Sequence, residues 1–271
     1  ARPALIVTVL MIAVNAGLNY VLIYGKFGFP AMGIVGSGYA SSIANAFGFF
    51  ALLGWVAFRA PFKKFHVLKG NWRPNLARQR ELVWLGLPIG MTAIFEGGLF
   101  NAGVVLMGFL GPIALAAHQI AINFASITFM TALGLAMAGT VRVGLAAGAG
   151  DAEGVRRAGY ATMLIACGMM AVFAIVMLVF PQSIASLYLK NDDPNFAAVV
   201  AMASGFFFIA AFFQVFDALQ VAAAFALRGL KDAQMPMLIT GISYWAIGFP
   251  VCYLLAFHAG LGGDGIWIGY V

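Results

Sequence analysis

The sequence predicts an all-α protein that forms a polytopic bundle of transmembrane helices. Of its 271 residues, 63% are hydrophobic and 9% are charged, whereas soluble domains average about 45 to 50% apolar and about 25% charged residues. Seven apolar stretches are long enough to cross a hydrocarbon core, which takes about 20 helical residues. The basic residues that give the net charge of +6 gather at the ends of these stretches. They therefore indicate membrane topology, and we expect no nucleic-acid partner.

The seven predicted spans are separated by short connections, with one exception. The exception is segment 59–80, which is polar and rich in Lys and Arg. We interpret it as a loop beside anionic lipid headgroups and as a boundary between two parts of the chain. An eighth apolar stretch begins at Gly265. The seven spans are expected near residues 3–24, 35–58, 81–109, 113–140, 157–180, 196–227 and 234–257.

The distribution of Lys and Arg predicts which span ends face the cytoplasm. Thirteen of the 15 basic residues lie on one side of the expected topology, and Lys26 and Lys190 lie on the other. The positive-inside rule makes the richer side, including segment 59–80, cytoplasmic. The first span then runs outward, and the alternation holds through every crossing.

Similar stretches near the two ends of the chain indicate an internal repeat. PALI at residues 3–6 resembles PMLI at 236–239, and GIVGSGY at 33–39 resembles GIWIGY at 265–270. The first two spans therefore look like the end of one half, and the last two like the end of a second half. Such repeats are typical of transporters, whose sites lie between the halves near the midplane of the membrane. The missing partners would precede the first residue, so we expect the chain to be a fragment.

Two acidic residues lie deep inside apolar spans and are the leading candidates for function. Counted from the cytoplasmic ends of their spans, Glu96 lies about 20 Å and Asp217 about 16 Å into the membrane, at about 1.5 Å per residue. A carboxylate at such a depth costs about 2.5 to 3.5 kcal/mol and usually faces a bundle interior or a wet cavity. We expect the two acids to share one cavity, where each can carry a proton or, with amide and hydroxyl oxygens, bind Na⁺. The alternative is a structural acid that only hydrogen-bonds a neighbouring helix.

Amide side chains accompany these acids. Gln214 and Gln220 lie three residues to either side of Asp217 and therefore on the same side of the helix. Gln119 and Asn123, four residues apart, form a second polar stripe. Both sets are candidates to line a cavity for the transported molecule, although hydrogen bonding between helices explains the second stripe equally well.

Three smaller features are ambiguous. Asn15 and Asn19 stack on one face of the first span, where they either bind a cation or bridge two helices. Asp192 and Asp193 form an acidic outer loop, which is either a solvated turn or a patch that attracts cationic compounds. We interpret His118, near the outer end of its span, as a hydrogen-bonded residue in preference to a proton relay.

No signature of catalysis is present in the sequence. Gly33, Gly36 and Gly38 follow no predicted strand and precede no GKS or GKT, so they do not form a phosphate-binding loop. No HExxH or GxSxG pattern occurs either. Cys167 and Cys252 lie inside apolar runs and offer neither a disulfide framework nor a CxxC metal site. We therefore expect no enzyme and no cofactor, and transport that an ion gradient drives.

Several stretches together resemble the multidrug and toxic compound extrusion (MATE) family, in particular its bacterial NorM-like branch. They are LGLPIGMTAIFEGGLFNAGVVLMG, ALAAHQIAINFASITFM with a following RVG, FQVFDALQVAAAFALRGLKD and ITGISYWAIGFP. The resemblance covers nearly the whole chain. It implies twelve helices in two six-helix lobes, related by a pseudo-twofold repeat around a central cavity. This chain would hold helices five to eleven and the start of helix twelve. Residues 1–58 would end the N-terminal lobe, 59–80 would link the lobes, and 81–271 would belong to the C-terminal lobe.

The resemblance also implies roles for individual residues. Glu96 and Asp217 match the second-lobe acids that are implicated in cation coupling, which makes them the candidate Na⁺ site. Asn15 and Asn19 match a first-lobe pair that works with an acid on helix one, which would precede this chain. Ser37 stands where a hydroxyl residue joins that first-lobe cluster.

One position departs from the pattern of some sodium-coupled relatives. They have a tyrosine four residues before the acid of helix ten, and this chain has Phe213 there. Without that hydroxyl, Na⁺ binding at Asp217 is disfavoured and proton coupling gains support.

From these observations we expect a secondary active transporter that exchanges cationic or amphipathic drugs for H⁺ or Na⁺. It would work as a monomer in the lipid bilayer of the bacterial cytoplasmic membrane. The main alternative is a flippase or exporter of lipid-linked oligosaccharide or polysaccharide from the same superfamily, whose cavity would be more basic. An intramembrane aspartyl protease would need its two acids side by side in a motif of their own. A structural scaffold would leave both buried acids unexplained.

Overall fold

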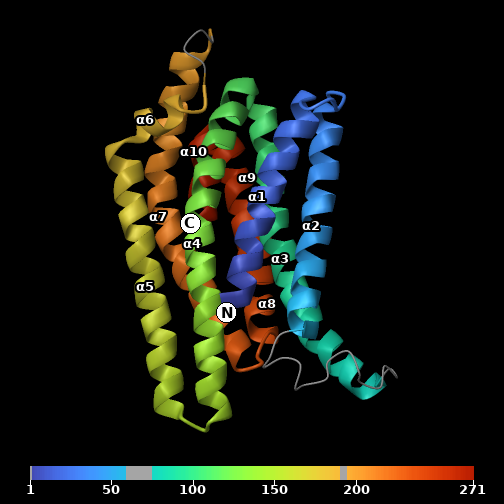
Figure 1. Cartoon of the computed structure of the whole chain (residues 1–271). Coiled ribbons are helices and arrows are strands. Elements are labelled where there is room, and N and C mark those ends of the chain that lie inside the picture. The colour runs from blue at the N-terminus through green and yellow to red at the C-terminus, as the bar shows by residue number, and fades with distance from the viewer. Residues whose placement is uncertain (1, 59–74, 190–193) are drawn as a thin grey trace. The chain divides into compact units, whose positions relative to one another are not determined.

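The computed structural model describes residues 2–58, 75–189 and 194–271, and within these ranges every regular element is a helix (Figure 1). The chain divides into two compact units, Ala1–Pro74 and Asn75–Val271. The first unit contains α1 (Arg2–Tyr24) and α2 (Gly33–Phe58). The second unit contains α3 (Leu76–Leu110), α4 (Pro112–Gly148), α5 (Ala152–Val179), α6 (Pro181–Ser186), α7 (Phe196–Gly229), α8 (Gln234–Gly241), the π-helical segment η3 (Ile242–Gly248), α9 (Phe249–Tyr253), the π-helical segment η4 (Leu254–His258) and α10 (Gly262–Tyr270).

Seven helical stretches in the described ranges are long and apolar enough to cross a membrane, which confirms the predicted spans. The largest differences between the predicted spans and the observed helices lie at the polar ends of the helices. Helix α3 begins at Leu76, inside the segment that was expected to be a loop, and α4 extends to Gly148. The rest of that expected loop, 59–74, lies outside the described residues. The predicted eighth stretch forms α10.

Two capping side chains and a proline mark the starts of three long helices, α3, α5 and α4. The side chain of Asn75 accepts hydrogen bonds from two backbone N–H groups of α3, at 3.1 and 3.2 Å. Asp151 caps α5 in the same way, through the N–H of Gly154 at 2.8 Å. Pro112 occupies the start of α4, where its missing N–H is not needed. The helices therefore extend beyond the apolar stretches that mark them in the sequence.

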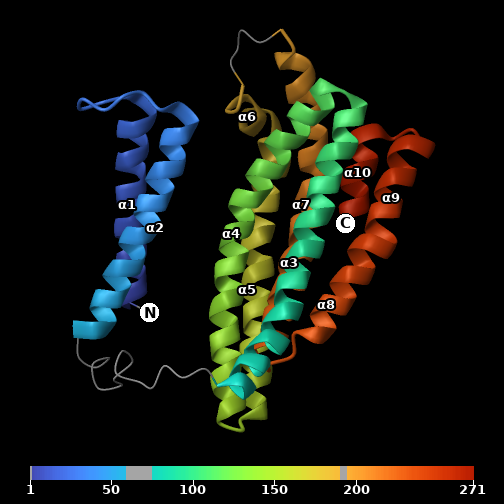
Figure 2. The same ribbon diagram turned by 90° about the vertical axis from the view of Figure 1, so that its right-hand side faces the viewer.

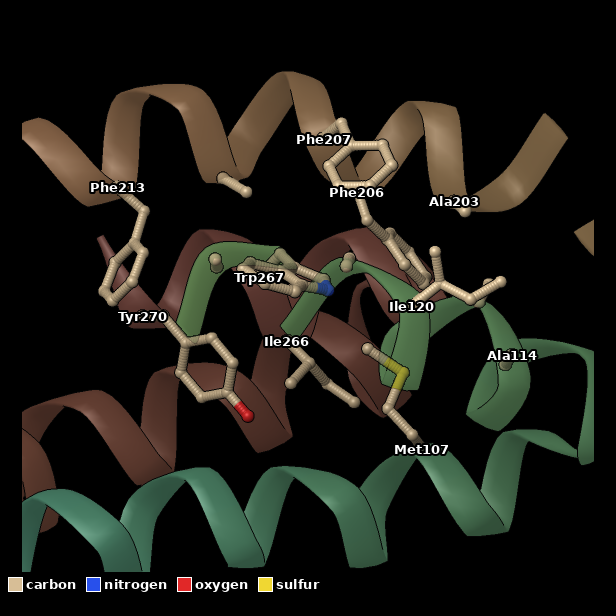
Figure 3. Close-up of a cluster of buried hydrophobic side chains, with 14 of the residues drawn as sticks. Met107, Ala114, Ile120, Ala203, Phe206, Phe207, Phe213, Ile266, Trp267 and Tyr270 are labelled. Carbon is tan, nitrogen blue, oxygen red and sulfur yellow. The ribbon is translucent and has the colours of Figure 1, made fainter. Parts of the chain in front are cut away.

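An apolar core joins α3, α4, α7 and α10 in the second unit (Figure 3). Trp267 of α10, Phe206 of α7 and Met107 of α3 are fully buried in it. A small residue lets α10 approach the preceding span: a Cβ on Gly265 would lie 2.6 Å from the carbonyl carbon of Leu255. Close backbone contact of this kind is a common source of helix association in membranes. The core holds together the three helices that carry the candidate site, α3, α4 and α7.

The last long span is one continuous helix that consists of α8, η3, α9 and η4 (Figure 2). The turn at the end of η3 is wide, because the N–H of Phe249 bonds to the carbonyl of Tyr244, five residues back. Pro250 follows directly. In an α-helix its ring would clash with the carbonyl of Ala246, four residues earlier. Local π-helical adjustments are a known way for membrane helices to tolerate proline, and the span continues through Pro250 to His258.

The first unit is a pair of helices joined by a short turn. Gly36 of α2 lies against α1, where a Cβ would come within 2.7 Å of the carbonyl oxygen of Leu22. The N–H of Met32 donates to the same carbonyl at 2.9 Å. Gly25 takes a φ of +64° in the turn, a conformation that glycine adopts without strain. These contacts fix α2 against α1.

Candidate functional site

The second unit contains a cavity of about 350 Å³ between α3, α4 and α7. Both intramembrane acids line it, so the structure brings together the two residues that the sequence places on different spans. Most of the remaining wall is apolar or aromatic. The lining includes Glu96 and Phe100 of α3, Phe129 of α4, and Phe213, Gln214 and Asp217 of α7.

Asp217 is almost fully buried, with 7% of its surface exposed. Its Oδ1 atom has no hydrogen-bond partner within the part of the chain that the structure describes. Glu96 lies close enough to Asp217 for their charges to interact, and close enough to Arg228, near the C-terminal end of α7, to be attracted by it. Two carboxylates that share a cavity repel each other when both are ionised. A proton or a cation bound between them removes this repulsion and supplies a partner for Oδ1.

Gln214 lines the same cavity, but both ends of its amide are occupied. Its Oε1 accepts a hydrogen bond from the Thr128 hydroxyl of α4 at 3.0 Å, and its Nε2 donates to the Met170 carbonyl of α5 at 3.2 Å. Gln214 therefore ties three helices together. Its amide oxygen keeps a second lone pair and its nitrogen a second hydrogen, so it can still contact a ligand in the cavity.

Gln220 lies three residues after Asp217 on α7 and is not part of the cavity wall. Its Oε1 accepts a hydrogen bond of 2.8 Å from the hydroxyl of Tyr244. Sequence reasoning did not select Tyr244, because a single tyrosine in an apolar span gives no signal until its partner is known.

Phe213 forms part of the aromatic wall of the cavity. Its ring meets that of Phe100 edge-on, with centroids 5.9 Å apart, and it also contacts Trp267 and Tyr270 of α10. Phe213 thus connects the cavity to the buried core of the unit.

The structure does not bring Gln119 and Asn123 into this cavity. Gln119 is exposed, and the Oδ1 of Asn123 accepts a hydrogen bond of 3.1 Å from the hydroxyl of Tyr188. Ser126, on the same side of α4, does line the cavity. Gln119 lies seven residues before Ser126, or about 10 Å further along the helix. The stripe is therefore longer than the cavity. The acidic loop residues Asp192 and Asp193 lie outside the described residues.

The first-lobe candidates lie in the other compact unit. The Nδ2 of Asn19 donates to the Oδ1 of Asn15 at 2.9 Å, so the pair is joined within α1. The Oδ1 of Asn19 is buried and has no partner among the described residues. Ser37 is half-buried on α2. One amide oxygen of the pair thus has no hydrogen bond within the described residues.

The described residues hold no group of three or more His, Cys, Asp and Glu side chains that could bind a metal ion. Glu96 and Asp217 alone would give a monovalent cation two carboxylates and would leave the rest of its shell to water, backbone or hydroxyl oxygens. A proton needs no such shell. The residues present therefore suit a proton at least as well as Na⁺.

A model of one protein family, described as MatE, matches residues 88–254. This stretch is more than half of the chain and contains both cavity acids. The chain belongs to the MatE family.

Curated bacterial relatives of this MatE chain are similar along nearly its whole length. A protein called "Probable multidrug resistance protein NorM" from Mesorhizobium japonicum is 45% identical over 270 residues, which cover 99% of this chain and 58% of the relative. A "Multidrug resistance protein NorM" from Burkholderia vietnamiensis is 44% identical over 269 residues, with coverage of 99% and 58%. The MatE chain thus spans a little under three fifths of the length of these relatives.

Solved structures show the same fold at low sequence identity. The eukaryotic MATE transporter AtDTX14 superimposes with a TM-score of 0.84 at 21% identity, over 98% of this chain and 57% of that one. A MATE structure in a bent conformation gives a TM-score of 0.81 at 18% identity, with coverage of 99% and 57%. The predicted fold class and family are therefore confirmed. The MatE chain belongs to a family of transporters and not of enzymes, and it is a multi-pass protein of the bacterial inner membrane.

Proposed function

We propose that this MatE chain is part of a multidrug efflux transporter that exports cationic or amphipathic drugs in exchange for H⁺ or Na⁺. The single observation that carries the proposal is the shared cavity of Glu96 and Asp217, in which one carboxylate oxygen lacks a partner. The names of the bacterial relatives, multidrug resistance proteins, support the drug as cargo.

The walls of the cavity suit a cation with an apolar body. Phe100 and Phe129 offer aromatic rings, and Met130 offers a flexible thioether that adapts to different shapes. The two acids offer negative charge at one side. A lipid-linked sugar would bring a phosphate, and no Lys or Arg is found among the residues that line this cavity. The cavity therefore favours drug efflux over the flippase alternative.

Competition at the acids would couple the two fluxes. A proton or Na⁺ that enters from outside neutralises the acids, which weakens their attraction for a cationic drug. By linkage, the drug weakens ion binding to the same extent. Each charge that moves inward contributes about 2.3 kcal/mol per 100 mV of membrane potential. Because Phe213 has no hydroxyl to offer Na⁺, we propose H⁺ as the principal coupling ion.

The test is ethidium efflux by the full-length transporter, with the pH gradient and the Na⁺ gradient imposed separately. We expect wild-type efflux to follow the pH gradient, and Glu96→Gln and Asp217→Asn to abolish it at normal expression. Glu81→Gln is a matched control, because Glu81 is an exposed acid on the same helix as Glu96. Unchanged efflux in both cavity variants would refute the proposal.

A further inference from the structure

The segment η3 contacts α7 close to one cavity acid. The hydroxyl of Tyr244 donates its hydrogen bond of 2.8 Å to Gln220, which lies three residues after Asp217 on α7. Three residues are slightly less than one helical turn, so Gln220 and Asp217 are neighbours on the helix surface. Tyr244 thus restrains the rotation of α7 at the level of the acid.

The next residue of η3 contacts α3 close to the other acid. The Nε1 of Trp245 donates to the carbonyl of Phe95 at 3.2 Å, and Phe95 directly precedes Glu96. Gly98 makes room for the indole, because a Cβ there would lie 2.8 Å from the Trp245 ring. Trp245 therefore restrains the α3 backbone beside Glu96.

Two consecutive side chains of one segment thus reach two different helices, each beside one of the acids. A π-helical turn contains more residues than an α-helical turn, so neighbouring side chains point in more similar directions. This geometry lets Tyr244 and Trp245 contact α7 and α3 together. Conversion of η3 to a regular α-helix would change both directions. π-Helical turns are rare, and they occur frequently at functional sites.

We propose that Tyr244 and Trp245 are positioning residues that set the separation of Glu96 and Asp217, and hence the affinity of the cavity for its coupling ion. The inference rests on the proposed function, and it assigns a role in ion binding to the last long span, which carries Tyr244 and Trp245. Neither side chain lines the cavity. Both therefore act through the helices that carry the acids, and the drug does not need to contact them.

The experiment measures drug efflux by the full-length transporter in proteoliposomes as a function of the concentration of the driving ion. Tyr244→Phe removes one hydroxyl and keeps the ring. We expect the ion concentration for half-maximal efflux to change about five-fold, the worth of a typical neutral hydrogen bond, while the maximal rate is retained. Trp245→Phe removes the bond to Phe95 and should produce a shift of the same kind. Loss of packing alone would lower the amount of folded protein and leave the ion dependence unchanged.

A double-mutant cycle separates the pair from its surroundings. Gln220→Leu should shift the ion dependence as Tyr244→Phe does, and the double variant should shift it no further, because both changes remove the same bond. Tyr253→Phe is the matched control, since Tyr253 lies on the same span and its ring contacts that of Phe257 at a tilt. It should behave as wild type.

Asp217→Asn in the same assay distinguishes failure of the positioning role from failure of the proposed function. If Asp217→Asn abolishes ion-driven efflux while Tyr244→Phe and Trp245→Phe keep the ion dependence of wild type, the positioning role is wrong and the proposed function stands. If Asp217→Asn keeps the wild-type ion dependence, the proposed function falls and the inference falls with it. Additive shifts in the double variant would also overturn the role of the Tyr244 to Gln220 bond.

Discussion

The hydroxyl of Thr128 and the amide oxygen of Gln214 form a hydrogen bond of 3.0 Å between α4 and α7. Gln214 is buried, and its amide nitrogen bonds to α5 on the other side. One residue therefore fixes the rotation of α7 against two neighbours. Because Asp217 lies three residues further on the same helix side, this bond also directs the acid into the cavity.

Thr128→Val is expected to destabilise the protein, because it leaves the Gln214 oxygen buried without its partner. Such a loss costs about 1 to 3 kcal/mol in soluble proteins, and bonds between membrane helices average about 0.6 kcal/mol. Thermal unfolding in detergent should show a lower Tm. Thr131→Val is the control, because within the described residues the Thr131 hydroxyl bonds only to the Thr128 carbonyl of its own helix. Equal effects of the two variants would mean that the bond between the helices contributes nothing.

Phe213→Tyr is expected to make efflux respond to Na⁺. Phe213 lines the cavity beside Asp217, and a hydroxyl there would add an oxygen ligand for Na⁺. Efflux should be measured at a fixed pH while the Na⁺ concentration is varied. Phe216→Tyr is the control, because Phe216 is exposed on another side of α7. A Phe213→Tyr protein that remains indifferent to Na⁺ would show that the missing hydroxyl does not decide the coupling ion.

Gly98→Ala is expected to reduce stability and efflux together. The added Cβ would lie 2.8 Å from the Trp245 ring, which would have to move away from the Phe95 carbonyl. Overpacking of this kind typically costs about 1 to 3 kcal/mol. Gly90→Ala on the same helix meets nothing within 4 Å and should be neutral or stabilising, since alanine favours helix. The Tm values of the two variants are compared with that of wild type. A higher Tm for Gly98→Ala would contradict the close contact between Gly98 and the Trp245 ring.

Gly265→Ala is expected to prevent α10 from docking. Its Cβ would meet the backbone of Leu255 and Ala256 at 2.6 to 2.8 Å, and backbone cannot rotate away as a side chain can. We expect a loss of monodisperse protein in size-exclusion chromatography. Gly168→Ala on α5 is the control, because no atom lies within 4 Å of the added carbon. Normal elution of Gly265→Ala would mean that the two segments can separate without cost.

The sequence predicts the spans well because membrane crossing is a local property of about 20 apolar residues. It misses the start of α3, since the cap at Asn75 continues the helix through polar residues that an apolar criterion rejects. It also predicts that Glu96 and Asp217 approach each other, because two isolated acids in apolar spans need a common polar environment.

Other parts of the site depend on tertiary contacts that leave no local trace. The bond from Tyr244 to Gln220 joins residues 24 positions apart on two spans. The three-residue spacing from Gln214 to Asp217 correctly predicts the side of the helix on which Gln214 lies. Nothing in that spacing reveals that the Gln214 amide forms hydrogen bonds with Thr128 and Met170. The π-helical turn of η3 is equally hidden, although Pro250 gives a reason for it once the structure is known.

The length of α4 has a consequence for the surface of the protein. Its 37 residues extend about 55 Å at about 1.5 Å per residue, whereas the hydrocarbon core is about 30 Å thick. A large part of the helix must therefore stand in the aqueous phase or among headgroups, together with the turn that leads into α5. The charged residues of that turn remain hydrated, and the tip of the hairpin formed by α4 and α5 projects from the membrane into water.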